Sequence, residues 1–260
     1  MTLLHELGAI WLFSLQVFRT FLTTKGNFQP ILAQIASISL RTLPTVIFSG
    51  IFVGGILVLQ LNLILSKYDA QSLLGGLNTS TIIRQVGPLI ISFLLAGKIG
   101  AFTAAELGTM RVTEQIDAIE CLGTHPIQYL IVPRFLGIMV SSLFLLLIGL
   151  TFSIVGAMGI AKQSCGINFL QFMGSIPKFT DFWTLTQAII QSLIYGTIVA
   201  AVSCHQGFTA KGGARGVGQA VTRAAVYTNF YIVLANWITN HFLNFFEQIV
   251  KSGYLYESSF

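Results

Sequence analysis

An acidic segment over residues 106–123 combines charge with a regular apolar pattern. On a helix with 100° per residue, its later acidic side chains spread over one side and its aliphatic side chains gather on another. The acidic residues are Glu106, Glu114, Asp117 and Glu120, and the aliphatic residues are Val112, Ile116 and Ile119. Such a helix could fill a groove on a partner protein and pair with basic residues on its rim. The alternative is a solvated helix that only connects two other elements.

Two cations, Arg84 and Lys98, interrupt an apolar stretch that is rich in small residues. A charged side chain inside a bilayer is costly, so such residues are functional candidates by default. The fork of an arginine matches the oxygens of a phosphate group. We therefore expect Arg84, and less strongly Lys98, to bind the headgroup of a lipid. The alternative is that both long side chains reach the membrane surface and only solvate their charges there.

Reactive groups for catalysis are not found together in this sequence. The three cysteines and four histidines stand apart, so no metal site is predicted. The glycine-rich residues 207–223 lack the GxxxxGK[ST] pattern and predict a flexible basic turn rather than a nucleotide-binding loop. The predicted membrane spans hold no acidic residue except Glu106 and Glu247 at their ends, which argues against a lipid-modifying enzyme. We expect neither an ATPase site nor a cofactor.

The composition indicates that lipid surrounds these residues. Of 260 residues, 54% are hydrophobic and only 9% are charged, against roughly 25% charged in an ordinary soluble domain. The net charge of +5 comes from scattered residues without an aromatic-basic module, so nucleic acid is not an expected partner. The sequence predicts an all-α integral membrane protein.

About five membrane-spanning helices are predicted, because each span needs about 20 apolar residues. They are residues 43–65, 82–107, 135–161, 182–203 and 224–246. The second contains Arg84 and Lys98, and we favour a full crossing over a re-entrant turn because the acidic segment after it should lie in water. One domain over 1–260 is expected, with the membrane region over 43–246 and a C-terminal tail over 247–260.

The first 42 residues predict helices on the membrane surface. Residues 3–22 are apolar but contain His5, Glu6 and Arg19, and they lack the cleavage site of a signal peptide. A helix lying in the interface fits this pattern, and residues 29–41 predict a second one. Lysines and arginines near the span ends favour an N-terminus inside the cell or organelle. The acidic segment would then be a cytoplasmic helix.

Three segments resemble the MlaE family of ABC-transporter permeases. Residues 84–134, which begin RQVGPLIISFLLAGKIGAF, closely resemble its central signature. GGARGVGQAVTRAAV over residues 212–226 resembles its second signature, and LFSLQVFR over 12–19 resembles its opening surface helix. Many members have Arg-Glu where this chain has Arg84-Gln85. The family includes bacterial lipid permeases and the plastid permease of the trigalactosyldiacylglycerol pathway.

The resemblance implies a homodimeric permease bound to two cytoplasmic or stromal ATPase subunits and to a substrate-binding protein of the MCE type. Its substrate would be phospholipid or a related polar lipid, moved across or out of a bacterial inner membrane or a plastid inner envelope. The segment around 106–120 would be the coupling helix that docks on the ATPase. A non-transporting membrane scaffold is the alternative function.

A pair of glycines in the first span predicts close helix packing. Gly50 and Gly54 form a GxxxG pattern, and Val58 follows one turn later. Small residues let helix backbones approach closely in lipid. Packing within one chain and a seam between two copies are both consistent with the pattern. Because five spans offer little wall around a two-tailed lipid, we expect a two-fold dimer with these residues near the seam or the lipid cavity.

Overall fold

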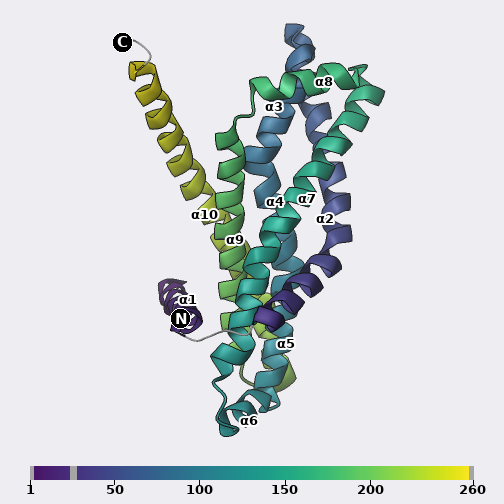
Figure 1. The fold of residues 1–260 in the computed structure, drawn as a ribbon. Coiled ribbons are helices and arrows are strands. Elements are labelled where there is room, and N and C mark those ends of the chain that lie inside the picture. The colour runs from purple at the N-terminus through teal and green to yellow at the C-terminus, as the bar shows by residue number, and fades with distance from the viewer. Residues whose placement is uncertain (1–2, 24–27, 258–260) are drawn as a thin grey trace. The chain divides into compact units, whose positions relative to one another are not determined.

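The computed structural model describes residues 3–23 and 28–257 of the chain (Figure 1). Within these ranges every regular element is a helix, and no strand occurs. The α-helices of the described residues are α1 (Leu3–Thr23), α2 (Phe28–Leu65), α3 (Leu74–Thr81), α4 (Gly87–Leu95), α5 (Ala101–Val112), α6 (Gln115–Cys121), α7 (Val132–Cys165), α8 (Phe169–Ser175), α9 (Phe182–Phe208) and α10 (Gly213–Glu257). The predicted all-α fold is confirmed.

Four helical runs in the described part of the chain are long and apolar enough to cross a membrane. They are Phe28–Tyr68, Gln71–Val112, Ile127–Cys165 and Phe182–Phe208. Each contains one of the first four predicted spans. The fifth predicted span, over 224–246, lies inside the 45-residue helix α10. Asparagines at 229, 236, 240 and 244 lower the hydropathy of α10, so the number five stays a prediction.

The helix α2 differs from the expected surface helix followed by a separate span. Residues 29–41 continue without a break into the first span, and Pro44 lies inside the helix rather than at its start. A proline has no N–H to donate, so the carbonyl of Leu40 loses its usual partner in the helix. The predicted boundary at residue 42 is therefore not a boundary between two helices.

Two compact units divide the described chain. Unit 1 comprises Met1–Pro44, Ile91–Leu145 and Leu193–Ile232, and unit 2 comprises Thr45–Ile90, Leu146–Ser192 and Val233–Phe260. The boundaries fall inside α2, α4, α7, α9 and α10 rather than in linkers. The connections predicted to face the cytoplasm, over 113–126 and 209–212, thus belong to unit 1. The connections around α3 and α8 belong to unit 2.

Three π-helical turns interrupt the long helical runs. They are η3 (Ile82–Val86), η4 (Ala96–Gly100) and η5 (Ile127–Ile131). Arg84 lies in η3 and Lys98 lies in η4, so each cation of the second apolar stretch occupies such a turn. π-helical turns are rare and are frequent at functional positions. This placement singles out the same two cations that the sequence singled out by charge.

The core of unit 2 contains the glycine pair of the first span. A Cβ added at Gly50 would lie 2.8 Å from the carbonyl oxygen of Gly149, and one added at Gly54 would lie 1.9 Å from that of Ser153. Both glycines therefore pack against α7 of the same chain. Val58 is fully buried in a cluster with Leu74 and Phe172. In this structure α7, α3 and α8 of the same chain pack against Gly50, Gly54 and Val58, and a place for these residues near a dimer seam or lipid cavity stays a prediction.

The helix α1 has two apolar sides in unit 1. Ile10, Phe13 and Val17 are buried, and the Phe13 ring lies 5.5 Å from the ring of His205 in α9. Its opposite side exposes Trp11, Leu12, Leu15, Phe18 and Leu22. A helix that packs one apolar side against the protein and exposes another suits a membrane interface. The interfacial position of α1 stays a prediction.

Candidate functional site

The acidic segment folds as two helices rather than one. The helix α5 ends at Val112, and α6 begins at Gln115 after a bend. At the bend Glu114 has a φ of 58° in the left-handed region, which no helix continues through. Gly123, with a φ of 77°, follows α6 in the conformation that favours glycine at a helix end. The segment is therefore a short helix held between two left-handed residues.

An ion pair spans the bend between α5 and α6. The guanidinium of Arg111, in the last turn of α5, donates to the carboxylate of Asp117 in the first turn of α6. The same guanidinium lies 5.8 Å from the ring centre of Phe208. The carboxylate of Asp117, expected to meet a basic residue of a partner protein, thus already has a basic partner within its own chain.

The aliphatic side of the segment turns inward. Ile116 is only 1% exposed and packs within unit 1, and Val112 and Ile119 are half-buried. The expectation that these three form a ridge free to fill a partner's groove is wrong for Ile116, because the chain itself covers that side chain. Ile116 instead holds α6 against its own unit.

A different surface of the segment faces outward. Its exposed residues include Glu114, Ala118 and Glu120. Leu122, directly after α6, is 84% exposed. Leu122 is not among the predicted docking residues, although it follows Ile119 by three residues, a helical spacing, and directly precedes a helix-ending glycine. The outer surface therefore combines two carboxylates with one large aliphatic side chain.

Glu106 of α5 joins that helix to α7. Its carboxylate oxygen Oε1 accepts a hydrogen bond from Nη2 of Arg134 at 2.8 Å. Glu106 lies in α5, and Arg134 lies in the first turn of α7. Arg134 is only 8% exposed. Glu106, expected on the docking surface, thus belongs to a contact within unit 1.

Arg84 is neutralised by an acidic residue of α10. Its Nη1 donates to Oε2 of Glu247 at 2.8 Å, and its Nη2 donates to Oε1 of Glu247 at 3.2 Å and to the hydroxyl of Thr184 at 3.2 Å. The amide of Gln187 donates to the same carboxylate at 3.4 Å. All four residues belong to unit 2. The expectation that Arg84 offers its charge to a lipid phosphate is not supported, because a carboxylate takes both arms of its fork.

Polar side chains continue along α9 and α10 within unit 2. Gln191 donates to the side-chain oxygen of Asn240 at 3.0 Å, and Asn240 donates to the side-chain oxygen of Asn236 at 2.7 Å. Such side chains hydrogen-bond across helices in membranes. The Gln191–Asn240 bond, together with the Gln187–Glu247 bond, joins α9 to α10.

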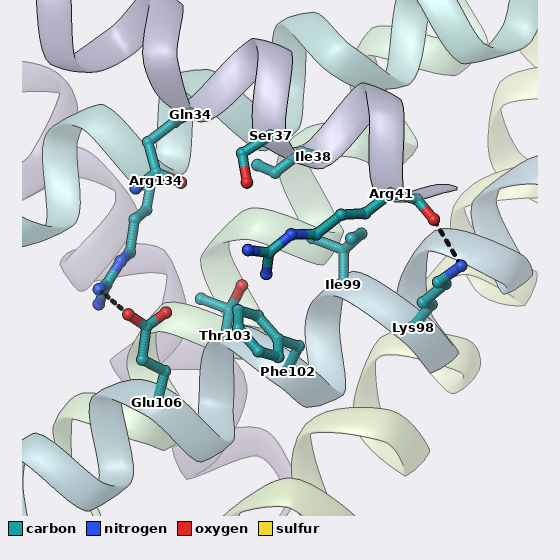
Figure 2. Close-up of a pocket in the computed structure, with 10 residues that line it drawn as sticks. All are labelled: Gln34, Ser37, Ile38, Arg41, Lys98, Ile99, Phe102, Thr103, Glu106 and Arg134. Carbon is teal, nitrogen blue, oxygen red and sulfur yellow. Dashed lines mark hydrogen bonds and ion pairs between the residues drawn. The ribbon is translucent and has the colours of Figure 1, made fainter. Parts of the chain in front are cut away.

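Lys98 lies at a cavity in unit 1. Its ammonium donates to the backbone carbonyl of Arg41 at 2.6 Å, as Figure 2 shows. The cavity has a volume of about 110 Å³ and is lined by Arg41, Phe102, Glu106 and Arg134 beside Lys98. The guanidinium of Arg41 lies 5.5 Å from the ring centre of Phe102. Lys98 is thus the predicted lipid-binding residue that the structure places at a cavity.

Comparison with known proteins gives consistent relatives over most of the chain. A family model described as Permease MlaE matches residues 31–242. A protein of Synechocystis sp. named as a probable ABC transporter permease is 33% identical over 240 residues, which cover 92% of this chain and 90% of the relative. The chloroplastic protein TRIGALACTOSYLDIACYLGLYCEROL 1 of Arabidopsis thaliana is 31% identical over 227 residues, covering 87% of this chain and 65% of the relative. The probable permease ycf63 of Porphyra purpurea is 33% identical over 207 residues, or 78% of each chain.

Proposed function

The chain belongs to the MlaE permease family, and from this premise we propose that it is the membrane subunit of a lipid-moving ABC transporter. A separate ATPase subunit would supply the energy, and the substrate would be a phospholipid or a related polar lipid. The chain itself is a multi-pass protein of a bacterial or plastid membrane, given its long apolar helices and its relatives from both sources.

The observation that carries the proposal is the outward surface of the α5–α6 segment. A permease that relies on another subunit for ATP hydrolysis must receive the energy through a contact. The segment offers Leu122, 84% exposed, beside the exposed carboxylates of Glu114 and Glu120. Because the resemblance to the MlaE family implies that this segment is the coupling helix, we propose that Leu122 and the two carboxylates form the surface that docks on the ATPase.

The contacts behind this surface connect it to the long helices of unit 1. Ile116 packs α6 into the unit, and the Arg111–Asp117 pair ties α6 to α5. The Glu106–Arg134 pair then ties α5 to α7. A displacement of α6 by the ATPase would therefore reach two long helices through one buried side chain and two ion pairs.

Lipid as the substrate is supported by one relative and by the membrane surroundings. The relative from Arabidopsis carries the name of a galactolipid, trigalactosyldiacylglycerol. For this chain we propose a polar lipid with two acyl chains, a second copy of the chain to complete the enclosing wall, and an MCE-type protein as the carrier beyond the membrane. Mass spectrometry of the lipid that co-purifies with the intact complex would identify the substrate.

The docking surface is tested by replacing Leu122 with aspartate. We expect Leu122→Asp to lose the ATPase during co-purification from native membranes, because burying a leucine contributes about 1.5–3 kcal/mol and an unpaired buried charge opposes binding. The matched control is Leu170→Asp, at a leucine of α8 that is 77% exposed in unit 2. Full retention of the ATPase by Leu122→Asp, with intact ATP-driven lipid transfer, would exclude this segment as the docking element.

A further inference from the structure

The cavity at Lys98 gathers more positive charge than it neutralises. Its charged lining residues are three cations, Arg41, Lys98 and Arg134, and one carboxylate, Glu106. The difference is an excess of two positive charges in a cavity of about 110 Å³. A single water molecule needs only about 10–15 Å³ by this kind of measure, so a group of several heavy atoms fits. The lining therefore selects for a small anionic group.

Arg134 has a hydrogen-bond donor that the described residues leave unsatisfied. Its Nη2 donates to Glu106, but its Nη1 is buried without a partner among the described residues. The whole residue is only 8% exposed. A buried donor without an acceptor is costly, and nearly all such donors in proteins have an acceptor from protein, water or an ion. An anion in the cavity would supply that acceptor.

Arg41 reaches into the cavity from α2. Figure 2 shows its guanidinium extended between Arg134 and Lys98, on the side of Phe102. The planar fork of a guanidinium suits the oxygens of a phosphate group. The hydroxyls of Ser37 and Thr103 also line the cavity and can donate to an anion.

An exposed apolar side chain, Phe102, lines this cavity, and a second one, Leu40, is the chain neighbour of its lining residue Arg41. Leu40 precedes Arg41 and is 70% exposed, and Phe102 precedes Thr103 and is 51% exposed. Free phosphate gains no stabilisation from contact with apolar side chains, whereas the acyl chains of a lipid pack against them. The cavity therefore combines cations that suit a phosphate group with an exposed aromatic side chain that suits hydrocarbon.

We propose that this cavity binds the phosphate group of an anionic lipid from the leaflet on the predicted cytoplasmic side. Arg41 and Arg134 donate to the phosphate oxygens, and Lys98 adds its charge. The proposal rests on the proposed function only in taking a lipid as the source of the phosphate. Binding at this cavity needs no ATPase, so it is tested separately from docking.

The test uses the full chain in nanodiscs of phosphatidylcholine with a minor fraction of phosphatidylglycerol. Native mass spectrometry counts the phosphatidylglycerol retained per chain. We expect the double variant Arg41→Gln/Lys98→Gln to retain it about tenfold less, as the loss of charge-assisted hydrogen bonds predicts. Both side chains are exposed, so the variant should keep its fold. The matched control is Lys211→Gln/Arg215→Gln, which removes two exposed cations of unit 1 outside the cavity.

A loss of bound phosphatidylglycerol in the cavity variant but not in the control variant supports binding of a lipid phosphate at this cavity. If no lipid is retained but inorganic phosphate binds the wild-type chain and not the cavity variant, the anion site stands and its source is free phosphate. Equal retention by the wild type and the cavity variant, without phosphate binding, overturns the site, and so does an equal loss in the control. Each of these outcomes is independent of whether Leu122→Asp releases the ATPase.

Discussion

Arg84 of η3 and Glu247 of α10 form a two-point ion pair, with Nη1 2.8 Å from Oε2 and Nη2 3.2 Å from Oε1. Paired forks of this kind are the strong form of a charge-assisted hydrogen bond. The Glu247 side chain is 12% exposed and the Arg84 side chain is 29% exposed. The pair fixes α10 to the turn that carries the first intramembrane cation.

Breaking this pair should destabilise the chain, whereas removing both charges should not. Arg84→Gln or Glu247→Gln alone leaves an uncompensated, largely buried charge, which costs about 3 kcal/mol. The double variant Arg84→Gln/Glu247→Gln should recover most of that loss, because two amides can hydrogen-bond to each other. Thermal unfolding of the wild type, the two single variants and the double variant in detergent completes this double-mutant cycle. A loss of bound lipid in Arg84→Gln, with unfolding at the wild-type temperature, would instead support a direct role in binding the headgroup.

Gly54 should tolerate no side chain, whether or not the chain forms a dimer. A Cβ there would lie 1.9 Å from the carbonyl of Ser153, so Gly54→Ala forces α2 and α7 apart and should destabilise by about 1–3 kcal/mol, as overpacking does. Gly159→Ala is the matched control, because its Cβ meets nothing within 4 Å. Thermal unfolding of Gly54→Ala and Gly159→Ala measures the difference in their stabilities. Equal stabilities would mean that the α2–α7 contact is looser than the structure has it.

The exposed side of α2 is where a seam involving the first span would have to lie. Phe48, Phe52 and Ile56 follow one another at four-residue spacing and are each at least 60% exposed. A cysteine at Phe52 should therefore crosslink to a second copy in native membranes if the first span lies at the seam. The glycine side of α2 packs against α7 of the same chain.

Ile116→Ala should lower the stability of the chain rather than remove a direct contact with the partner. Truncating a buried isoleucine costs about 2–5 kcal/mol, so α6 should loosen and the whole chain should unfold at a lower temperature. Ile119→Ala, at a half-buried position, should cost less. Circular dichroism on heating separates this effect from docking. Wild-type unfolding of Ile116→Ala, together with loss of the ATPase, would restore the view that Ile116 faces the partner.

The sequence predicted the helices better than the contacts between them. Apolar length is a property of each stretch alone, so the first four spans were found from the residues. The Arg84–Glu247 pair joins residues 163 positions apart, and periodicity within one helix says nothing of its register against another. For the same reason the GxxxG pattern predicted a close approach but not that its partner would be α7.

The acidic segment marks a second limit. The pattern predicted one two-faced helix, but the segment folds as the two helices α5 and α6. It did not predict the bend at Glu114, because only a few per cent of residues other than glycine adopt a positive φ, and side-chain type gives little warning. Nor does periodicity decide which face a chain buries against itself and which it leaves for a partner. Ile116, predicted on the docking ridge, is buried, and Leu122, for which no role was predicted, is exposed.

The Arg111–Asp117 pair should matter for coupling more than for folding or docking. Both side chains are partly exposed, at 34% and 50%, and such pairs contribute at most about 1 kcal/mol. Asp117→Asn should therefore keep the fold and retain the ATPase. It removes the tie between α6 and α5, so lipid-stimulated ATP hydrolysis should fall while basal hydrolysis is unchanged.

Two further variants make the coupling prediction specific. Arg111→Gln should lower stimulation at least as much as Asp117→Asn, because it also removes the contact with the Phe208 ring. The double variant should show no further loss beyond Arg111→Gln, because the Arg111–Asp117 pair is then already broken. Glu120→Gln is the control, since it removes an exposed carboxylate of the same helix that lies outside the pair. If Glu120→Gln lowers stimulation as much, the net charge of the surface governs coupling. If the Arg111 and Asp117 effects add, the two side chains act on different partners, and α6 does not pull on α5 through this pair.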